Sequence, residues 1–215
     1  MGGIMDGHVE WAVINRLKAM LDDPPPTKFN VTQTFAIFSA VLLWTKNRGW
    51  VAGKKARQPL VGEADQAADE FRKALAKELI TSEPWSLSRR VPRFELVPQI
   101  GTNSRELSVN GDFQDMPVEA FAEWLRNAIG HGDGRTIRPL HKHERPAYKT
   151  WLSGFQVFFP ETQTSERVLH LCLYDTDMRR IGSLLADRFC EALSRAPTYY
   201  MADVATRVIE TERVA

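Results

Sequence analysis

The sequence predicts a mainly helical bundle that carries one β-hairpin in its C-terminal third. Apolar residues recur at helical spacing through most of the chain, whereas two β-rich runs lie close together within residues 154–174. The chain has 215 residues, of which 43% are hydrophobic and 26% charged, and this composition is typical of a globular protein that can bury a core. We therefore expect a single domain over residues 1–215, with an irregular insertion around residues 82–115.

Two helices are expected at the start of the chain, over residues 4–21 and about 32–48. The first must end before the triple proline at 24–26, because proline lacks an N–H and disfavours helix at the preceding residue. The second is apolar nearly all round, which predicts a place at the centre of the core. The basic, glycine-containing stretch 49–59 is predicted to be a loop.

A third helix is expected over residues 63–80, where Phe71 and Leu75 belong to an apolar stripe that recurs every fourth residue. Prolines and arginines dominate the stretch that follows, and residues 93–97 alternate like a short strand. These features predict a long basic loop with short strands over residues 82–115.

The next helix is predicted from its start signal, in which Asp115 is followed by Pro117. One stripe of this helix is apolar, at Val118, Phe121, Leu125 and Ile129. The glycines at 130, 132 and 134 are expected to end it.

The hairpin is predicted from two β-rich runs, residues 155–159 and 168–173, which a polar stretch separates. Asp175 or Thr176 is expected to cap a further helix. The tail from Pro197 leaves room for one more short helix.

The charge balance limits the class of function. The formal net charge is +1, from 28 Lys and Arg against 27 Asp and Glu, which argues against a constitutive, purely electrostatic grip on nucleic acid. A local basic patch remains compatible with this balance.

Cysteines and tryptophans are expected in structural roles. Cys172 and Cys190 cannot form a disulfide framework or a four-ligand zinc site by themselves. Both fall on apolar patterns, as do Trp11, Trp44 and Trp124, so all five are expected in the core. The scarcity of cysteine favours a reducing compartment.

No stretch is long enough to span a membrane, because the longest apolar run, residues 35–44, is about half of the ~20 residues required. The first residues lack the basic cluster and apolar region of a secretory signal. We expect a cytoplasmic protein.

One segment stands apart from the rest of the chain. Arg126 and His131 flank four residues at the end of the amphipathic helix, and Asn127 follows the arginine. Glycines stand at alternate positions from Gly130 onward. An arginine and a histidine at this spacing are common by chance, so the argument depends on the whole segment. The simpler interpretation is a helix C-terminus with a capping histidine and terminating glycines.

The pattern R-N-x-x-x-H, continued as His-Gly-Asp-Gly-Arg-Thr-Ile-Arg-Pro, resembles the motif of HEPN proteins. These are small helical proteins, many of them ribonucleases of toxin–antitoxin and phage-defence systems. The resemblance covers roughly residues 121–140. It implies a HEPN-like bundle, a homodimer whose two motifs meet in a cleft, and RNA cleavage that leaves a 2′,3′-cyclic phosphate. It also implies control by a cognate antitoxin or another regulatory protein.

The residue types themselves suit RNA cleavage. Histidine titrates near neutrality and can act as the base for a 2′-hydroxyl, whereas arginine stays protonated and offers a planar fork to phosphate oxygens. We therefore predict Arg126 and His131 as catalytic, with Asn127 supporting the geometry. On a regular helix Arg126 and His131 lie roughly 140° apart in projection. Either the glycines unwind the helix end, or a second copy completes the site.

Arg135, Arg138 and Lys142 follow the motif and are expected to bind the RNA backbone. A two-fold axis beside the motif would double this local positive charge. We expect no metal and no other cofactor.

A metal site at His141, His143 and Glu144 is the weaker interpretation of that stretch, because no second cluster of ligands accompanies it. A solvated polar loop is favoured there.

Other functions remain open. A HEPN-like bundle can also act as a non-catalytic module that binds RNA or nucleotides or serves as a scaffold, and an antitoxin-like regulator is a third, weaker interpretation. Exposure of both Arg126 and His131 in a cleft would favour the enzyme, and burial of both would favour a structural role.

Overall fold

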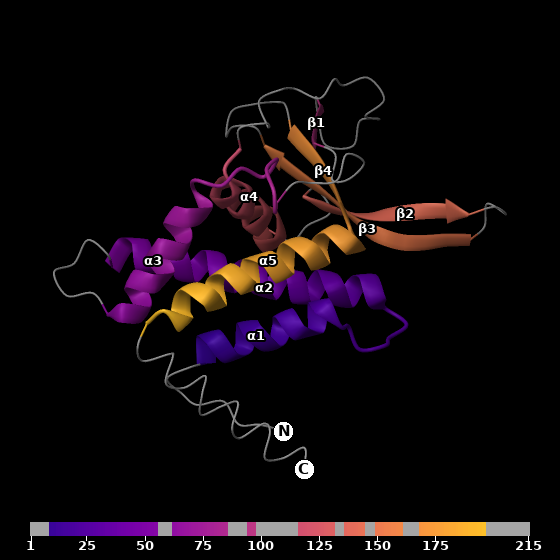
Figure 1. Cartoon of the computed structure of the whole chain (residues 1–215). Helices are drawn as coiled ribbons and strands as arrows, with labels where there is room; N and C mark the ends of the chain where they lie inside the picture. The colour runs from indigo at the N-terminus through magenta and orange to yellow at the C-terminus, as the bar shows by residue number, and fades with distance from the viewer. Residues whose placement is uncertain are drawn as a thin grey trace, which may run out of the picture.

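The computed structural model describes residues 9–55, 62–85, 94–97, 116–131, 136–144, 149–160 and 168–196. Over these residues the chain is mainly helical with one antiparallel sheet, as the sequence predicts (Figure 1). The helices are α1 (Val9–Asp22), α2 (Asn30–Lys55), α3 (Glu63–Leu75), α4 (Val118–His131) and α5 (Asp175–Ser194). The strands are β1 (Phe94–Val97), β2 (Ile137–Glu144), β3 (Lys149–Pro160) and β4 (Val168–Tyr174).

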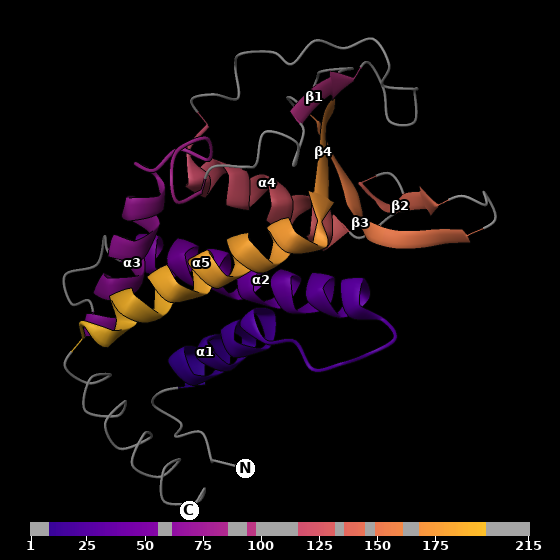
Figure 2. The same cartoon turned by 45° about the vertical axis from the view of Figure 1, so that its right-hand side comes forward.

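Helix α2 lies at the centre of the helical part, as predicted from its apolar sequence. It packs against all the other described helices, and Phe38, Val41 and Leu42 are fully buried. Helix α5 also packs on α1 and α3. In both views α1 lies on one side of α2 and α5, whereas α4 and the sheet lie on the other (Figures 1 and 2). The core therefore continues from the helices into the sheet.

Helix α2 continues to Lys55, so the prediction of a loop from residue 49 is wrong for residues 49–55. The reason is a close contact with α3. A Cβ added at Gly49 would lie 3.3 Å from Arg72 Cβ, and one at Gly53 would lie 2.9 Å from Arg72 Nε. These glycines let α3 approach α2 closely, and they do not interrupt the helix.

The sheet has the strand order β1-β4-β3-β2 over the described residues, and its neighbouring strands are antiparallel. The predicted hairpin is confirmed as β3 and β4, with Val157 opposite Leu171. The short strand predicted over residues 93–97 is confirmed as β1. The rest of the predicted irregular insertion beyond Trp85 lies outside the described residues.

Strand β2 was not predicted, because residues 137–144 read as a polar loop after the motif. Charged residues and Pro139 hide its alternation. The strand forms by pairing with β3. In this pairing Arg138 lies opposite Gln156, and the register shifts between Leu140 and His141. A strand at the edge of a sheet tolerates proline and charge.

The two faces of the sheet differ in chemistry. Val157, Leu171 and Leu173 are fully buried in the helical core. Phe155 contacts Phe35 of α2, with ring centroids 4.2 Å apart. The alternate residues face the other way, so the apolar side of the sheet is the side that α2 covers.

Cys172 belongs to the outer face of the sheet and is half-buried, so its prediction as a core residue is wrong. Cys190 on α5 is buried in the core, as predicted. Side chains alternate along a strand, so Cys172 points away from the core that Leu171 and Leu173 enter. The sequence did not indicate this, because both immediate neighbours of Cys172 are apolar.

Two of the three tryptophans predicted in the core pack against it, namely Trp11 and Trp124. The Trp11 indole also donates a hydrogen bond to Ser194 Oγ at 3.1 Å. The prediction is wrong for Trp44, which is 36% exposed on α2. A nearly all-apolar helix has more apolar surface than its four neighbours cover.

Helix boundaries differ from the predictions by a few residues. Helix α3 ends at Leu75 instead of near residue 80, and α5 is capped at Tyr174, one residue before the predicted Asp175. The predicted tail helix after residue 196 lies outside the described residues. None of the described helices is long and apolar enough to cross a bilayer.

Candidate functional site

Helix α4 carries the predicted catalytic residues in its last turns. It begins directly after Pro117, as the start signal predicts, and its apolar stripe is buried at Val118, Phe121 and Leu125. Ala128 completes this buried stripe in place of the predicted Ile129, which is half-buried. The remaining side of the helix is where the motif residues lie.

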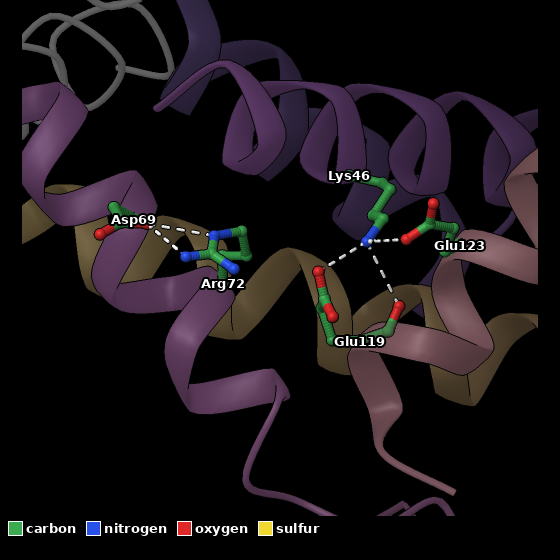
Figure 3. A network of polar contacts seen from close by, with 5 residues as sticks. All are labelled: Lys46, Asp69, Arg72, Glu119 and Glu123. Carbon is green, nitrogen blue, oxygen red and sulfur yellow. Dashed lines mark hydrogen bonds and ion pairs between the residues drawn. The ribbon is translucent and has the colours of Figure 1, made fainter. Parts of the chain in front are cut away.

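A buried lysine of α2 fixes one polar stripe of α4. Lys46 Nζ lies 2.9 Å from Glu119 Oε1 and 3.2 Å from Glu123 Oε2, and its side chain is 6% exposed (Figure 3). Lys46 also donates to the Glu119 carbonyl at 3.4 Å. This stripe of α4 therefore faces α2.

Arg126 lies on the same stripe, seven residues after Glu119 and three after Glu123. Its side chain is half-buried, and its Nε is a buried donor without a hydrogen-bond partner among the described residues. A buried guanidinium nitrogen without an acceptor is costly, so it is poised to bind an anion or a carbonyl.

Asn127 and His131 lie on the other flank of α4's outer side, at i and i+4. His131 is exposed and Asn127 is half-buried. The projection predicted from the sequence therefore holds, and the structure does not bring Arg126 and His131 together on one face of one chain.

The helix remains regular through its last glycine. Gly130 and His131 are both helical, and Thr136 Oγ1 donates to the Ala128 carbonyl at 3.0 Å just beyond the helix end. The first of the two predicted routes to a shared site, an unwound helix end, is therefore wrong over the described residues. Gly130 itself continues the helix, so it is not the glycine that ends it.

Two of the three predicted RNA-binding residues lie on β2, the strand that follows α4 in the chain. Lys142 is exposed, whereas Arg138 is half-buried with its Cζ 5.4 Å from the centroid of the Phe158 ring. Arg135 lies outside the described residues, as do Gly132 and Gly134. The structure thus places Arg138 and Lys142 on the strand that follows the motif.

The predicted metal alternative at His141, His143 and Glu144 is not tested by the described residues. His141 is exposed on β2, and no group of three or more possible ligands is found within the part of the chain that the structure describes. The side chains of His143 and Glu144 are outside that part.

Charged residues outside the motif form ion pairs that sequence reasoning missed. Asp69 on α3 is buried and accepts from Arg72 at 2.9 Å and from Lys73 at 2.6 Å (Figure 3 shows the Arg72 contact). Burial alone would raise the pKa of Asp69, but the hydrogen bonds from Lys73 and Arg72 outweigh it and lower the pKa below its ordinary value. The i, i+3 and i, i+4 spacings are the signal that could have found this cluster.

A second cluster joins three helices. Arg48 of α2 donates to Glu10 of α1 at 2.8 Å and to Asp65 of α3 at 2.5 Å. Burial acts to lower the pKa of Arg48, but the hydrogen bonds and charges of the two carboxylates raise it by more. The pKa is therefore raised overall, and the guanidinium stays charged. The cluster holds α1 and α3 against α2, and none of its three residues belongs to α4.

A surface groove of about 670 Å³ lies beside this second cluster. Its lining residues are Glu10, Ala40, Leu43, Trp44, Asn47, Arg48 and Val51. None of them belongs to α4, so the groove and the motif are separate features.

Comparison with known proteins gives no relative. No family model matches the chain, and no curated protein and no solved structure matches it.

Proposed function

We propose that this protein is a metal-independent endoribonuclease of the HEPN type, whose site is completed by a second copy of the chain. The observation that carries the proposal is the placement of Arg126 and His131 on different flanks of α4, with the half-buried arginine on the flank toward α2 and the histidine on the exposed flank. Two antiparallel copies of α4 around a two-fold axis bring the arginine flank of one copy beside the histidine flank of the other.

The reaction follows from the residue types. His131 takes the proton of a 2′-hydroxyl, and the oxygen attacks the adjacent phosphorus. The bond from phosphorus to the 5′-oxygen breaks, and the departing oxygen takes a proton from solvent, which leaves a 2′,3′-cyclic phosphate and a 5′-hydroxyl. Arg126 binds the phosphate and stabilises the extra negative charge of the transition state. Its unpartnered Nε supports this role, because a bound phosphate supplies the acceptor that the described residues do not.

The remaining predicted residues hold the substrate. Asn127, one turn before His131 on the same flank, orients the imidazole or a phosphate. Arg138 and Lys142 bind the RNA backbone from β2, and Arg135, which lies between α4 and β2 in the sequence, adds positive charge. The HEPN resemblance extends the proposal to a toxin or anti-phage effector in the cytoplasm, controlled by a cognate antitoxin or regulatory protein.

A complementation experiment tests the shared site. Arg126→Ala and His131→Ala are each expected to abolish RNA cleavage without changing the oligomeric state. Unfolding the two variants together and refolding them gives mixed dimers that contain one intact site. Roughly a quarter of the wild-type activity is then expected from the mixture, since half of the dimers are mixed and each retains one of two sites.

The control is a parallel refolding of each variant alone, which is expected to remain inactive. EDTA is expected to leave the wild-type rate unchanged. Full activity in either single variant would refute the catalytic assignment, and no recovery in the mixture would refute the shared site.

A second function has one observation in its favour. Arg126 is half-buried on the side of α4 that faces α2, which is also compatible with a structural arginine in a non-catalytic RNA-binding or scaffold module. In that case the protein binds RNA without cutting it, and Arg126→Ala reduces stability instead of activity. Thermal unfolding of the variant beside its cleavage rate separates the two functions.

A further inference from the structure

The outer face of the sheet carries a cysteine and a histidine in contact. Cys172 and His170 lie two residues apart on β4 and so point the same way, and Cys172 Sγ is 3.6 Å from His170 Nε2. His170 is 7% exposed, whereas Cys172 is half-buried and keeps some access to solvent. The mechanism proposed above uses neither residue.

A hydrogen-bond chain fixes the tautomer of this histidine. The Gln156 amide donates through Nε2 to the Pro139 carbonyl at 3.3 Å, so its Oε1 is turned toward β4 as an acceptor. His170 Nε2 lies 3.0 Å from that oxygen. Because Oε1 can only accept, Nε2 must carry a proton, and the sulfur of Cys172 lies 3.6 Å from that protonated nitrogen.

Packing holds the imidazole in this position. The His170 ring stacks on Phe158, with centroids 4.7 Å apart and planes at 9°. Register places Arg138, Gln156 and Cys172 in one row across β2, β3 and β4. Glu95 of β1 stands opposite His170 in register at the other edge. The Cys172 sulfur therefore lies beside a fixed imidazole N–H, and Arg138 belongs to the same row of the register.

The other cysteine, Cys190, lies in an environment that favours the protonated thiol. Burial, and to a smaller degree the charge of Asp187, raises the pKa of Cys190 to about 12. Its thiol donates to the Trp11 carbonyl with a sulfur–oxygen distance of 3.7 Å. A thiol that donates is held protonated, whereas a sulfur that accepts from an N–H is stabilised as the thiolate.

We propose that Cys172 is a covalent modification site whose thiolate is oxidised by hydroperoxides. The sulfur attacks the nearer oxygen of the O–O bond, a sulfur–oxygen bond forms, and the O–O bond breaks. Sulfur loses two electrons to give a sulfenic acid, and the departing oxygen leaves as an alcohol or water after taking a proton from solvent. This inference does not depend on the ribonuclease activity.

Alkylation of the native full-length protein tests the first step. Limiting iodoacetamide is added at neutral pH, and the two cysteines are quantified separately, because trypsin releases them in the peptides 168–179 and 189–195. Cys172 is expected to react at least about tenfold faster than Cys190. In concentrated guanidinium chloride the two rates are expected to be equal. Equal or reversed rates in the native protein would overturn the proposal.

The variant His170→Phe tests the role of the imidazole. Phenylalanine keeps an aromatic ring against Phe158 but removes the N–H donor. We expect Cys172 to react about tenfold more slowly in this variant, with its reaction shifted to higher pH, whereas the slow rate of Cys190 reports an intact core. The matched variant His141→Phe, on exposed β2, is expected to react like the wild type. An unchanged Cys172 rate in His170→Phe would refute activation by the histidine.

Hydrogen peroxide followed by dimedone tests the oxidation itself. The adduct is expected on peptide 168–179, to be absent from peptide 189–195, and to be prevented when a thiol reductant is added before dimedone. Fast alkylation of Cys172 without a dimedone adduct would overturn the oxidation step.

Discussion

Lys46 of α2 reaches Glu119 of α4 with a distance of 2.9 Å between Nζ and Oε1, and this contact sets the rotation of the helix that carries the motif. The carboxylate of Glu123, one turn further along α4, forms an ion pair with the same Lys46 ammonium group. Since Arg126 continues that stripe, the buried lysine determines which flank of α4 faces α2 and which flank, with His131, remains outside.

Replacing Lys46 tests this arrangement. Lys46→Met is expected to lower the free energy of unfolding by about 1–3 kcal/mol, because the two carboxylates lose their buried partner but can still reach water. Urea denaturation measures the change. Lys54→Met is the control, since Lys54 is exposed above the Trp50 ring, and it is expected to cost less than about 1 kcal/mol. Equal losses in the two variants would contradict the role of Lys46.

Gly130→Ala is expected to stabilise the protein by roughly 0.5–1 kcal/mol. The residue is helical, and an added Cβ would meet no atom of the described residues within 4 Å, so alanine gains helix propensity without a clash. Thermal unfolding measures the effect. A loss of stability would instead indicate that Gly130 has a backbone conformation that alanine does not tolerate.

Gly154→Ala provides the contrast on β3. Its Cβ would collide with the Leu173 carbonyl oxygen, and a backbone atom in a paired strand cannot move aside. We expect a loss of about 1–3 kcal/mol or more. The same measurement applies, and a neutral substitution would show that β3 and β4 separate readily.

Two buried aspartates are expected to respond to pH in opposite directions. The pKa of Asp69 is lowered in the folded protein, so its contribution to stability is present above the unfolded value of 3.8 and is lost as pH falls through the lower folded value. The destabilisation caused by Asp69→Asn should therefore be larger at pH 7 than at pH 3. Urea titrations at both pH values measure it.

The pH dependence expected for Asp177 is the reverse of that expected for Asp69. Burial raises its pKa, against a hydrogen bond from the Tyr174 amide and the charge of Arg180, so its ionisation reduces stability as pH rises above 3.8. Asp177→Asn should therefore be more favourable at pH 7 than at pH 3. If both variants followed the same pH trend, the directions of the two shifts would be wrong.

Much of the helical framework could be predicted because its signals are local. The apolar period of α2, the proline before α4 and the β-rich runs of β3 and β4 each specify an element from a few neighbouring residues. The helical projection of Arg126 and His131 was also predictable, since it depends on spacing alone. Their catalytic role remains a prediction.

The errors arose where a distant partner decides the outcome. Gly49 looks like a helix end until Arg72 of α3 is seen against it, and β2 looks like a loop until Gln156 of β3 pairs with Arg138. The Cys172 contact was missed because the direction of a strand residue depends on register, which the sequence of a single run does not give.

The packing of α1 on α5 has a consequence for how the protein is made. Trp11 reaches Ser194, which is 183 residues further along the chain, and the cysteine of α5 donates to the Trp11 carbonyl. While the polypeptide is still on the ribosome, the first helix can pack on α2, but its α5-facing side has no partner until residues 175–194 have been synthesised. That side of the helix therefore stays uncovered for much of translation.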